Sequence, residues 1–208
     1  MKINKKASSM IEAIVITLII TMGMVGMFKI YTESIKLSIA TKNRIIAIQI
    51  AREGIEAMES IRGSNWILYS SDYKNCWNTL NYNGSCINNA GIGTDIQNNT
   101  SYVLKNDPSN RWILEEKPGL GSDYTDSLYR TDFRVKKDAN GFYTQSGGID
   151  FNPVFTREIK IEYIDTNLGA TNSNDEKMLV SSIVQRLDYS SSKPHKIKLE
   201  TILSNWKE

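Results

Sequence analysis

The hydrophobic pattern divides the chain into a uniformly apolar stretch, an amphipathic stretch and a long polar region. Residues 13–28 read AIVITLIITMGMVGMF without one charged side chain, and the acid Glu12 stands directly before them. A helix of about 20 apolar residues spans the hydrocarbon core of a bilayer. Residues 10–28 nearly supply that length. The pattern therefore predicts one membrane-spanning helix near the N-terminus.

Helical character continues beyond the apolar run, because residues 29–62 contain no proline and only one glycine, Gly54. Apolar residues recur there every three or four positions, at Ile48, Ala51, Ile55, Met58 and Ile61. Such spacing places them on one face of an amphipathic helix. Gly63-Ser64-Asn65 then supplies helix-stopping residues. We expect a helix over residues 8–62, its first half in the membrane and its second half on a globular domain.

Short alternating segments predict an antiparallel sheet in the second half of the chain. The strongest are residues 154–164, 178–187 and 196–203, in which apolar and polar side chains alternate. Weaker candidates are residues 102–104, 111–115, 130–136 and 141–145. Alternation of this kind is typical of strands that are solvated on one side.

The region between the helix and the sheet has a different composition. Residues 71–101 are rich in Asn, Ser, Gly and Asp, which predicts a long surface connection. The expected architecture is therefore an α+β fold. After the helix, a globular domain over residues 63–208 would hold a variable loop region at 63–110 and mainly sheet at 111–208.

Composition limits the function classes. The chain has 208 residues, a formal net charge of +2 and no long basic run, so it carries no nucleic-acid signal. Cys76 and Cys86 are its only cysteines. On an extracytoplasmic domain such a pair can persist as a disulfide, and two buried free thiols are the alternative.

The sequence lacks the combinations of residues that form common catalytic sites. His195 is the only histidine, so zinc clusters and a Ser-His-Asp arrangement have little to draw on. Residues 165–176 contain several oxygen-bearing side chains but no EF-hand spacing, so a polar hairpin loop is favoured there over a calcium site. We expect no enzyme activity and no cofactor.

The N-terminal residues resemble a known processing site. Lys2, Lys5 and Lys6 form a basic leader, and the residues that follow read Ala7-Ser8-Ser9-Met10-Ile11-Glu12. This junction resembles the cleavage and methylation site of type IV prepilins and pseudopilins. The resemblance implies that a prepilin peptidase removes residues 1–7, that Ser8 becomes the methylated N-terminus, and that Glu12 takes part in subunit assembly. Two positions differ from the family pattern: Ala7 stands in place of the usual Gly, and Ser8 in place of the usual Phe or Met.

The same resemblance implies a fold and a function. In minor pilin-like proteins a stretch similar to residues 51–62 ends a long helix and packs on a sheet, which is the pilin-like architecture. The chain would be a structural subunit, minor rather than major, of a type IV pilus or type II secretion-like filament. Its partners would be the prepilin peptidase, other pilin subunits contacted through the N-terminal helix, inner membrane lipids and assembly platform proteins.

Three other interpretations of the N-terminus compete with this one. A secretory signal peptide would carry its cleavage site after the apolar region, whereas the small residues here precede that region. A plain membrane anchor is the second alternative, and an anchored binding or adhesion protein that does not polymerise is the third. Lysines before the apolar run place the N-terminus in the cytoplasm and the polar domain outside. The filament interpretation adds later transfer from the inner membrane to the cell surface.

Overall fold

The computed structural model describes residues 5–88, 95–117, 123–139, 141, 143–164, 177–187 and 193–205, with side chains from Met10 onward. The chain forms two compact units, Met1–Ile45 and Ile46–Glu208. One long helix, α1 (Lys5–Leu68), contributes to both. The first unit is helix alone in its described part, and the second unit holds the sheet.

The helix α1 ends six residues later than the pattern predicts, at Leu68 rather than at residue 62. The reason is Asn65, which the sequence suggested as a helix-stopping residue. Its side chain is fully buried, and its amide donates to the backbone carbonyls of Trp77, at 3.3 Å, and Thr79, at 3.0 Å. These tertiary hydrogen bonds stabilise the last turns, so the expected end at 62 was wrong.

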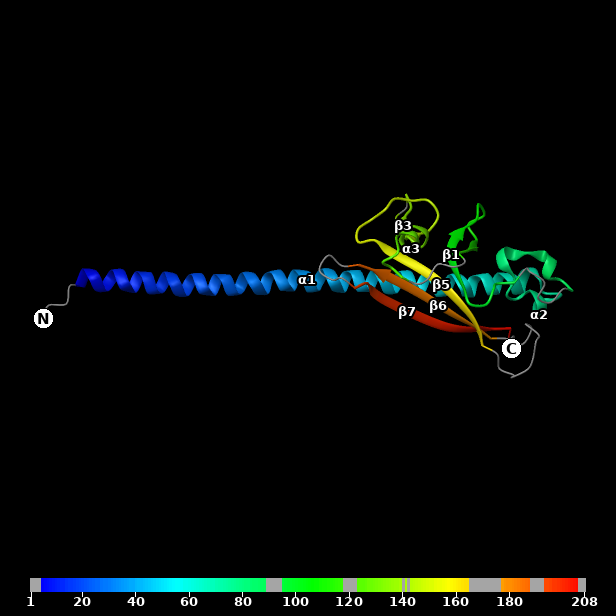
Figure 1. The fold of residues 1–208 in the computed structure, drawn as a ribbon, viewed down its shortest axis with the longest axis horizontal. Helices are drawn as coiled ribbons and strands as arrows, with labels where there is room; N and C mark the ends of the chain where they lie inside the picture. The colour runs from blue at the N-terminus through cyan, green and yellow to red at the C-terminus, as the bar shows by residue number, and fades with distance from the viewer. Residues whose placement is uncertain are drawn as a thin grey trace. The chain divides into compact units, whose positions relative to one another are not determined.

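The second unit contains an antiparallel sheet of five strands in the order β2-β1-β5-β6-β7 (Figure 1). Its strands are β1 (Thr100–Asn106), β2 (Trp112–Glu116), β5 (Phe155–Ile164), β6 (Lys177–Arg186) and β7 (His195–Ser204). A separate pair is formed by β3 (Lys136–Lys137) and β4 (Tyr143–Thr144). The α+β fold class and the three strongest predicted strands are confirmed.

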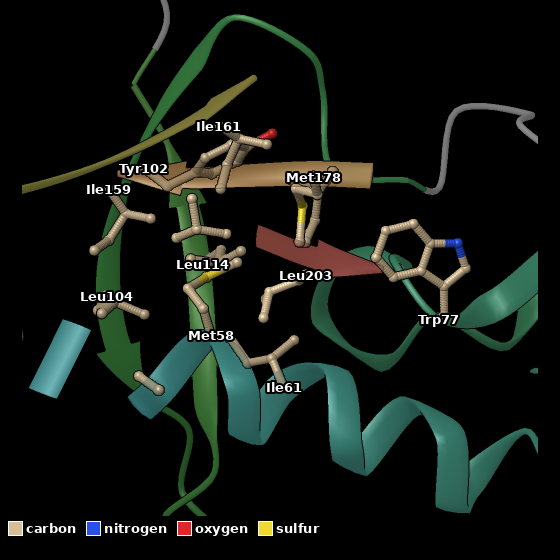
Figure 2. Close-up of a cluster of buried hydrophobic side chains, with 13 residues drawn as sticks. Met58, Ile61, Trp77, Tyr102, Leu104, Leu114, Ile159, Ile161, Met178 and Leu203 are labelled. Atoms are coloured by element: carbon tan, nitrogen blue, oxygen red, sulfur yellow. The ribbon is translucent and has the colours of Figure 1, made fainter. Parts of the chain in front are cut away.

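The inner face of the sheet packs against the part of α1 that belongs to the second unit. Figure 2 shows Met58 and Ile61 of α1 pointing toward Leu114, Met178 and Leu203 of three different strands. Nearer the start of the unit, a second buried cluster joins α1 to the strands β5, β6 and β7; it contains Ala47, Ile50, Ala51, Val135, Phe155 and Val184, with Ile197 and Leu199 packed against it. Of the five apolar residues predicted to share the buried face of the helix, Ala51, Met58 and Ile61 are buried and Ile55 packs against the core, whereas Ile48 is exposed.

Gly54 lies at a close approach of α1 to the sheet. A Cβ atom at this position would stand 2.4 Å from Ser182 Oγ and 2.9 Å from Ile159 Cδ1. Gly63, on the same helix, has nothing within 4 Å of such an atom. A helix with a larger residue at 54 could not approach β5 and β6 as closely.

We expect Gly54→Ala and Gly63→Ala to change stability in opposite directions. Overpacking against Ser182 should destabilise Gly54→Ala by about 1–3 kcal/mol, whereas better helix propensity should make Gly63→Ala more stable by about 0.4–1 kcal/mol. Urea unfolding of the detergent-solubilised chain, followed by tryptophan fluorescence, measures both. Equal effects of the two substitutions would show that the helix–sheet spacing does not depend on Gly54.

A short helix occupies part of the segment 130–136, where a strand was predicted. Helix α3 (Ser127–Asp132) begins after Asp126, whose Oδ1 accepts a hydrogen bond from the backbone N–H of Leu128 at 2.8 Å. Tyr129 and Phe133 stand four residues apart, and their ring centroids lie 4.8 Å from each other. The strand prediction was wrong because a helix cap and an aromatic pair at helical spacing outweigh the short apolar alternation.

Helix α3 lies on the outer face of the sheet, the face opposite α1, where it contacts β1, β5 and β6. The Tyr129 hydroxyl donates to Glu158 Oε2 at 3.0 Å, and Gln185 Nε2 donates to that hydroxyl at 3.1 Å. Thr156 and Glu158 are fully buried as a result. The expectation of strands solvated on one side was therefore wrong for β5 and β6, and it holds for β7, whose exposed and half-buried residues alternate.

In the region predicted as a surface connection over 71–101, the described residues 71–88 and 95–101 form more secondary structure and are more buried than the composition indicates. It contains α2 (Tyr73–Cys76), the 3₁₀ turns η1 (Leu80–Tyr82) and η2 (Gly84–Cys86), and the start of β1. Trp77 and Thr79 lie in the core. The Asn81 side chain donates to the carbonyl of Leu114 and accepts from its N–H, so this polar segment completes the edge of β2 as a strand would.

Candidate membrane and assembly segment

The apolar part of α1, residues 10–28, has no apolar side chain buried within the structure. Met10 is 70% exposed at one end and Phe28 is 74% exposed at the other. Among the described residues, α1 is the one helix long and apolar enough to cross a membrane. A helix that is hydrophobic on all sides requires an apolar environment around it, such as lipid or other helices.

Polar groups within this segment are satisfied by the helix itself. Thr17 and Thr21 donate their hydroxyls to the backbone carbonyls three residues earlier, each at 2.9 Å. The backbone N–H and C=O groups pair along the helix, as a membrane interior demands. Beyond the apolar run, Lys36 forms an ion pair with Glu33 at 2.9 Å, on side chains that are both largely exposed.

The three residues predicted for processing and assembly lie in the first turns of α1. The backbone of Ala7 and Ser8 is helical, and the side chain of Glu12 is exposed. Residues four apart on a helix stand on one side, one turn from each other. Ser8 and Glu12 are thus placed on one face at the head of the apolar segment.

The predicted pair of cysteines forms a disulfide in the second unit. Cys76 and Cys86 are joined, and both are fully buried. The bond connects the end of α2 to the end of η2, next to the buried Trp77. No described cysteine is a free thiol.

We expect Cys76→Ser/Cys86→Ser to loosen this loop without affecting membrane insertion, because the apolar segment lies elsewhere in the chain. Loss of a bond that closes a loop of this size costs about 3 kcal/mol in the chain-entropy account. Limited proteolysis should cut the variant faster between Asn75 and Asn88, while membrane fractionation remains unchanged. Alkylation of native exported protein would contradict the bond if it labelled either cysteine.

A buried ion pair between α1 and the sheet was not foreseen from the sequence. The guanidinium of Arg157 is fully buried, and its Nη1 lies 3.2 Å from Glu53 Oε2. Its Nε donates to Gln145 Oε1 at 3.0 Å, and the Gln145 amide donates to the carbonyls of Phe133 and Arg157. The sequence contains one indication of this pair. Arg157 alternates with Phe155 and Ile159, so a basic residue stands among side chains that face inward.

Burial sets the ionisation of several groups in the second unit. Desolvation lowers the pKa of Arg157, and the carboxylate of Glu53 opposes that effect. Desolvation raises the pKa of Tyr102 to about 12. It also raises the pKa of Tyr129, an effect that the neighbouring Glu158 carboxylate increases. These tyrosines therefore stay neutral at physiological pH. The Tyr129 hydroxyl donates to Glu158, whereas the Tyr102 hydroxyl accepts from the backbone N–H of Gln97 at 2.7 Å.

The described part of the chain contains no candidate metal site. No group of three or more His, Cys, Asp or Glu side chains there could hold a metal ion. His195 lies exposed at the first position of β7. The oxygen-rich loop considered for calcium, residues 165–176, lies outside the described residues.

No protein-family model, no curated protein and no solved structure matches this chain. What is established is a long N-terminal apolar helix and an antiparallel sheet that packs on its later part, an arrangement compatible with a pilin-like fold.

Proposed function

We propose that this protein is a subunit, and a minor one, of a type IV pilus or type II secretion-like filament. In this proposal the apolar part of α1 holds the chain in the inner membrane, with its N-terminus in the cytoplasm. A prepilin peptidase removes residues 1–7, and the assembly platform then transfers the subunit into a filament through contacts between N-terminal helices.

The observation that carries the proposal is the position of Glu12. It is an exposed acid at the head of a helix segment that is uncharged from residue 13 to residue 28 and exposed on all sides. A carboxylate in such a place is unfavourable in lipid unless a cation accompanies it. A plain membrane anchor gains nothing from it, whereas a subunit that binds its neighbours through charge pairing does.

The fold of the second unit supports the proposal in a weaker way. Its sheet packs on the later part of α1 and so keeps a globular body on one continuous helix. The fully buried disulfide suits an extracytoplasmic location. These features are also compatible with an anchored protein that never polymerises, so the test must address processing and assembly directly.

We expect the mature protein to begin at Ser8. The small residues Ala7, Ser8 and Ser9 precede the apolar segment, and Glu12 then becomes the fifth residue. Mass spectrometry of protein taken from the cell surface should find residues 1–7 removed and a methyl group on the Ser8 amine. Intact Met1 on surface-located protein would contradict the proposal.

Filament shearing separates the two remaining functions. A subunit should be released with sheared filaments and should co-sediment with them. If the chain is cut at Ser8 but remains wholly in the membrane fraction of a filament-bearing cell, it is an anchored surface protein and the assembly role is wrong.

A further inference from the structure

On the outer face of the sheet, α3 contacts β1, β5 and β6, and β7 keeps exposed residues on this face. Tyr129 of α3 bonds to Glu158 on β5 and to Gln185 on β6. In the strand register, the row of Glu158 continues through β6 to Lys198 on β7, and the row of Gln185 continues to Lys196. Both lysines are exposed. The open part of this face therefore lies in the same rows across the strands as the Tyr129 hydroxyl.

The face of β7 carries two exposed lysines and one exposed acid, Glu200, and the start of α3 carries two exposed carboxylates. Lys196 makes no ion pair with a described residue, and Lys198 remains 45% exposed although its Nζ lies 2.6 Å from Glu200 Oε1. At the start of α3, Asp123 and Asp126 are exposed carboxylates. Leu128 in the first turn of α3 is 63% exposed, so an exposed apolar side chain follows these acids in the chain.

We propose that a second copy of this chain covers the outer face of β7. The two copies pack outer face to outer face about a two-fold axis parallel to the strands, and α3 of each lies on β7 of the other. Rotation about such an axis leaves heights along the strands unchanged. Tyr129 of the second copy therefore stands at the height of the rows of Lys196 and Lys198, and in the proposed contact Asp123 and Asp126 of that copy face these lysines, so that the contact is self-complementary.

The direction of α1 agrees with this symmetry. Early residues of α1 in the unit, such as Ile50, cluster with the start of β5 at Phe155, whereas the later Ile61 clusters with Ile161. α1 and β5 thus run in the same direction. An axis parallel to the strands therefore keeps the part of α1 that packs on the sheet pointing the same way in both copies. Lysines along an edge strand disfavour strand-to-strand pairing, so the contact uses the face of β7 and not its edge.

Cross-linking of the full-length chain in detergent micelles tests the geometry. The native cysteines are bonded and buried, so an introduced cysteine supplies the free thiol. Copies with Lys198→Cys are mixed with copies with Ser127→Cys and treated with a short bismaleimide. We expect a cross-linked dimer from this mixture. The control mixes Glu59→Cys with Ser127→Cys and should give none, because Glu59 is an exposed residue of α1, the helix that packs on the inner face of the sheet. Equal cross-linking in both mixtures would overturn the arrangement.

Charge reversal tests the chemistry of the contact. In sedimentation equilibrium, Lys196→Glu/Lys198→Glu should raise the dimer dissociation constant about tenfold or more, and a factor of ten corresponds to about 1.4 kcal/mol. Adding Asp123→Lys and Asp126→Asn should restore association, because Asn preserves the cap of α3. The control Lys177→Glu changes an exposed lysine of β6 outside these rows and should have no effect. A wild-type chain that stays monomeric at all concentrations, or a reversal without effect, would refute the dimer. Neither result depends on whether the chain enters filaments.

Discussion

Glu12→Gln should reach the membrane and lose its leader as the wild-type chain does, yet enter filaments at about one tenth of the wild-type level or less. The glutamine keeps the size of the side chain and removes its charge. After cleavage the Ser8 amine carries a positive charge, with an ordinary pKa of about 7.7–8.0. A pair formed between this amine and Glu12 of a neighbouring subunit neutralises two charges that are costly in lipid. Loss of about 1.4 kcal/mol from such a pair is a tenfold loss of association.

The matched control is Glu33→Gln. Glu33 is the next acid along the same helix, it lies beyond the apolar segment, and it is exposed and paired with Lys36. We expect it to be incorporated normally. Quantitative immunoblots of sheared filaments and of membranes, from cells that express each variant, supply the measurement. If Glu12→Gln assembles as well as Glu33→Gln, then Glu12 pairs within its own chain or lies among headgroups, and it is not the docking group.

Glu53→Met should destabilise the second unit by about 3–5 kcal/mol, the range found when one partner of a buried ion pair is removed. Arg157 is fully buried, and Glu53 is its ion-pair partner among the described residues. Methionine keeps the approximate size of the glutamate side chain, but it leaves the buried guanidinium of Arg157 without its carboxylate partner. Urea unfolding of the detergent-solubilised chain should show a lower midpoint at an unchanged slope.

Two variants separate this mechanism from a general effect of losing a charge on α1. Glu56→Met removes an exposed acid three residues along the helix and should stay within about 0.5 kcal/mol of the wild type. Glu53→Met/Arg157→Met removes both charges and should recover most of the loss, because a buried pair can often be replaced by apolar residues without penalty. A double variant no more stable than Glu53→Met would mean that the loss arises from packing around residue 53.

The features that the sequence alone predicted are those that follow from local periodicity. An uninterrupted apolar run gave the membrane-length helix, and spacing by three and four identified the buried residues Ala51, Met58 and Ile61. Alternation of period two located β5, β6 and β7, because in a strand successive side chains face opposite sides. Pairing of Cys76 with Cys86 was foreseeable because no other cysteine competes for either.

The tertiary structure decided whatever depends on residues far apart in the chain. Asn65 extends α1 because its partners are carbonyls 12 and 14 residues away. Glu158 is buried because α3, formed where a strand was expected, supplies Tyr129 to bind it. Arg157 tolerates full burial because Glu53 approaches it from another element. Hydrogen bonds and ion pairs of this kind leave no periodic trace in a sequence, since only the packed chain brings the two partners together.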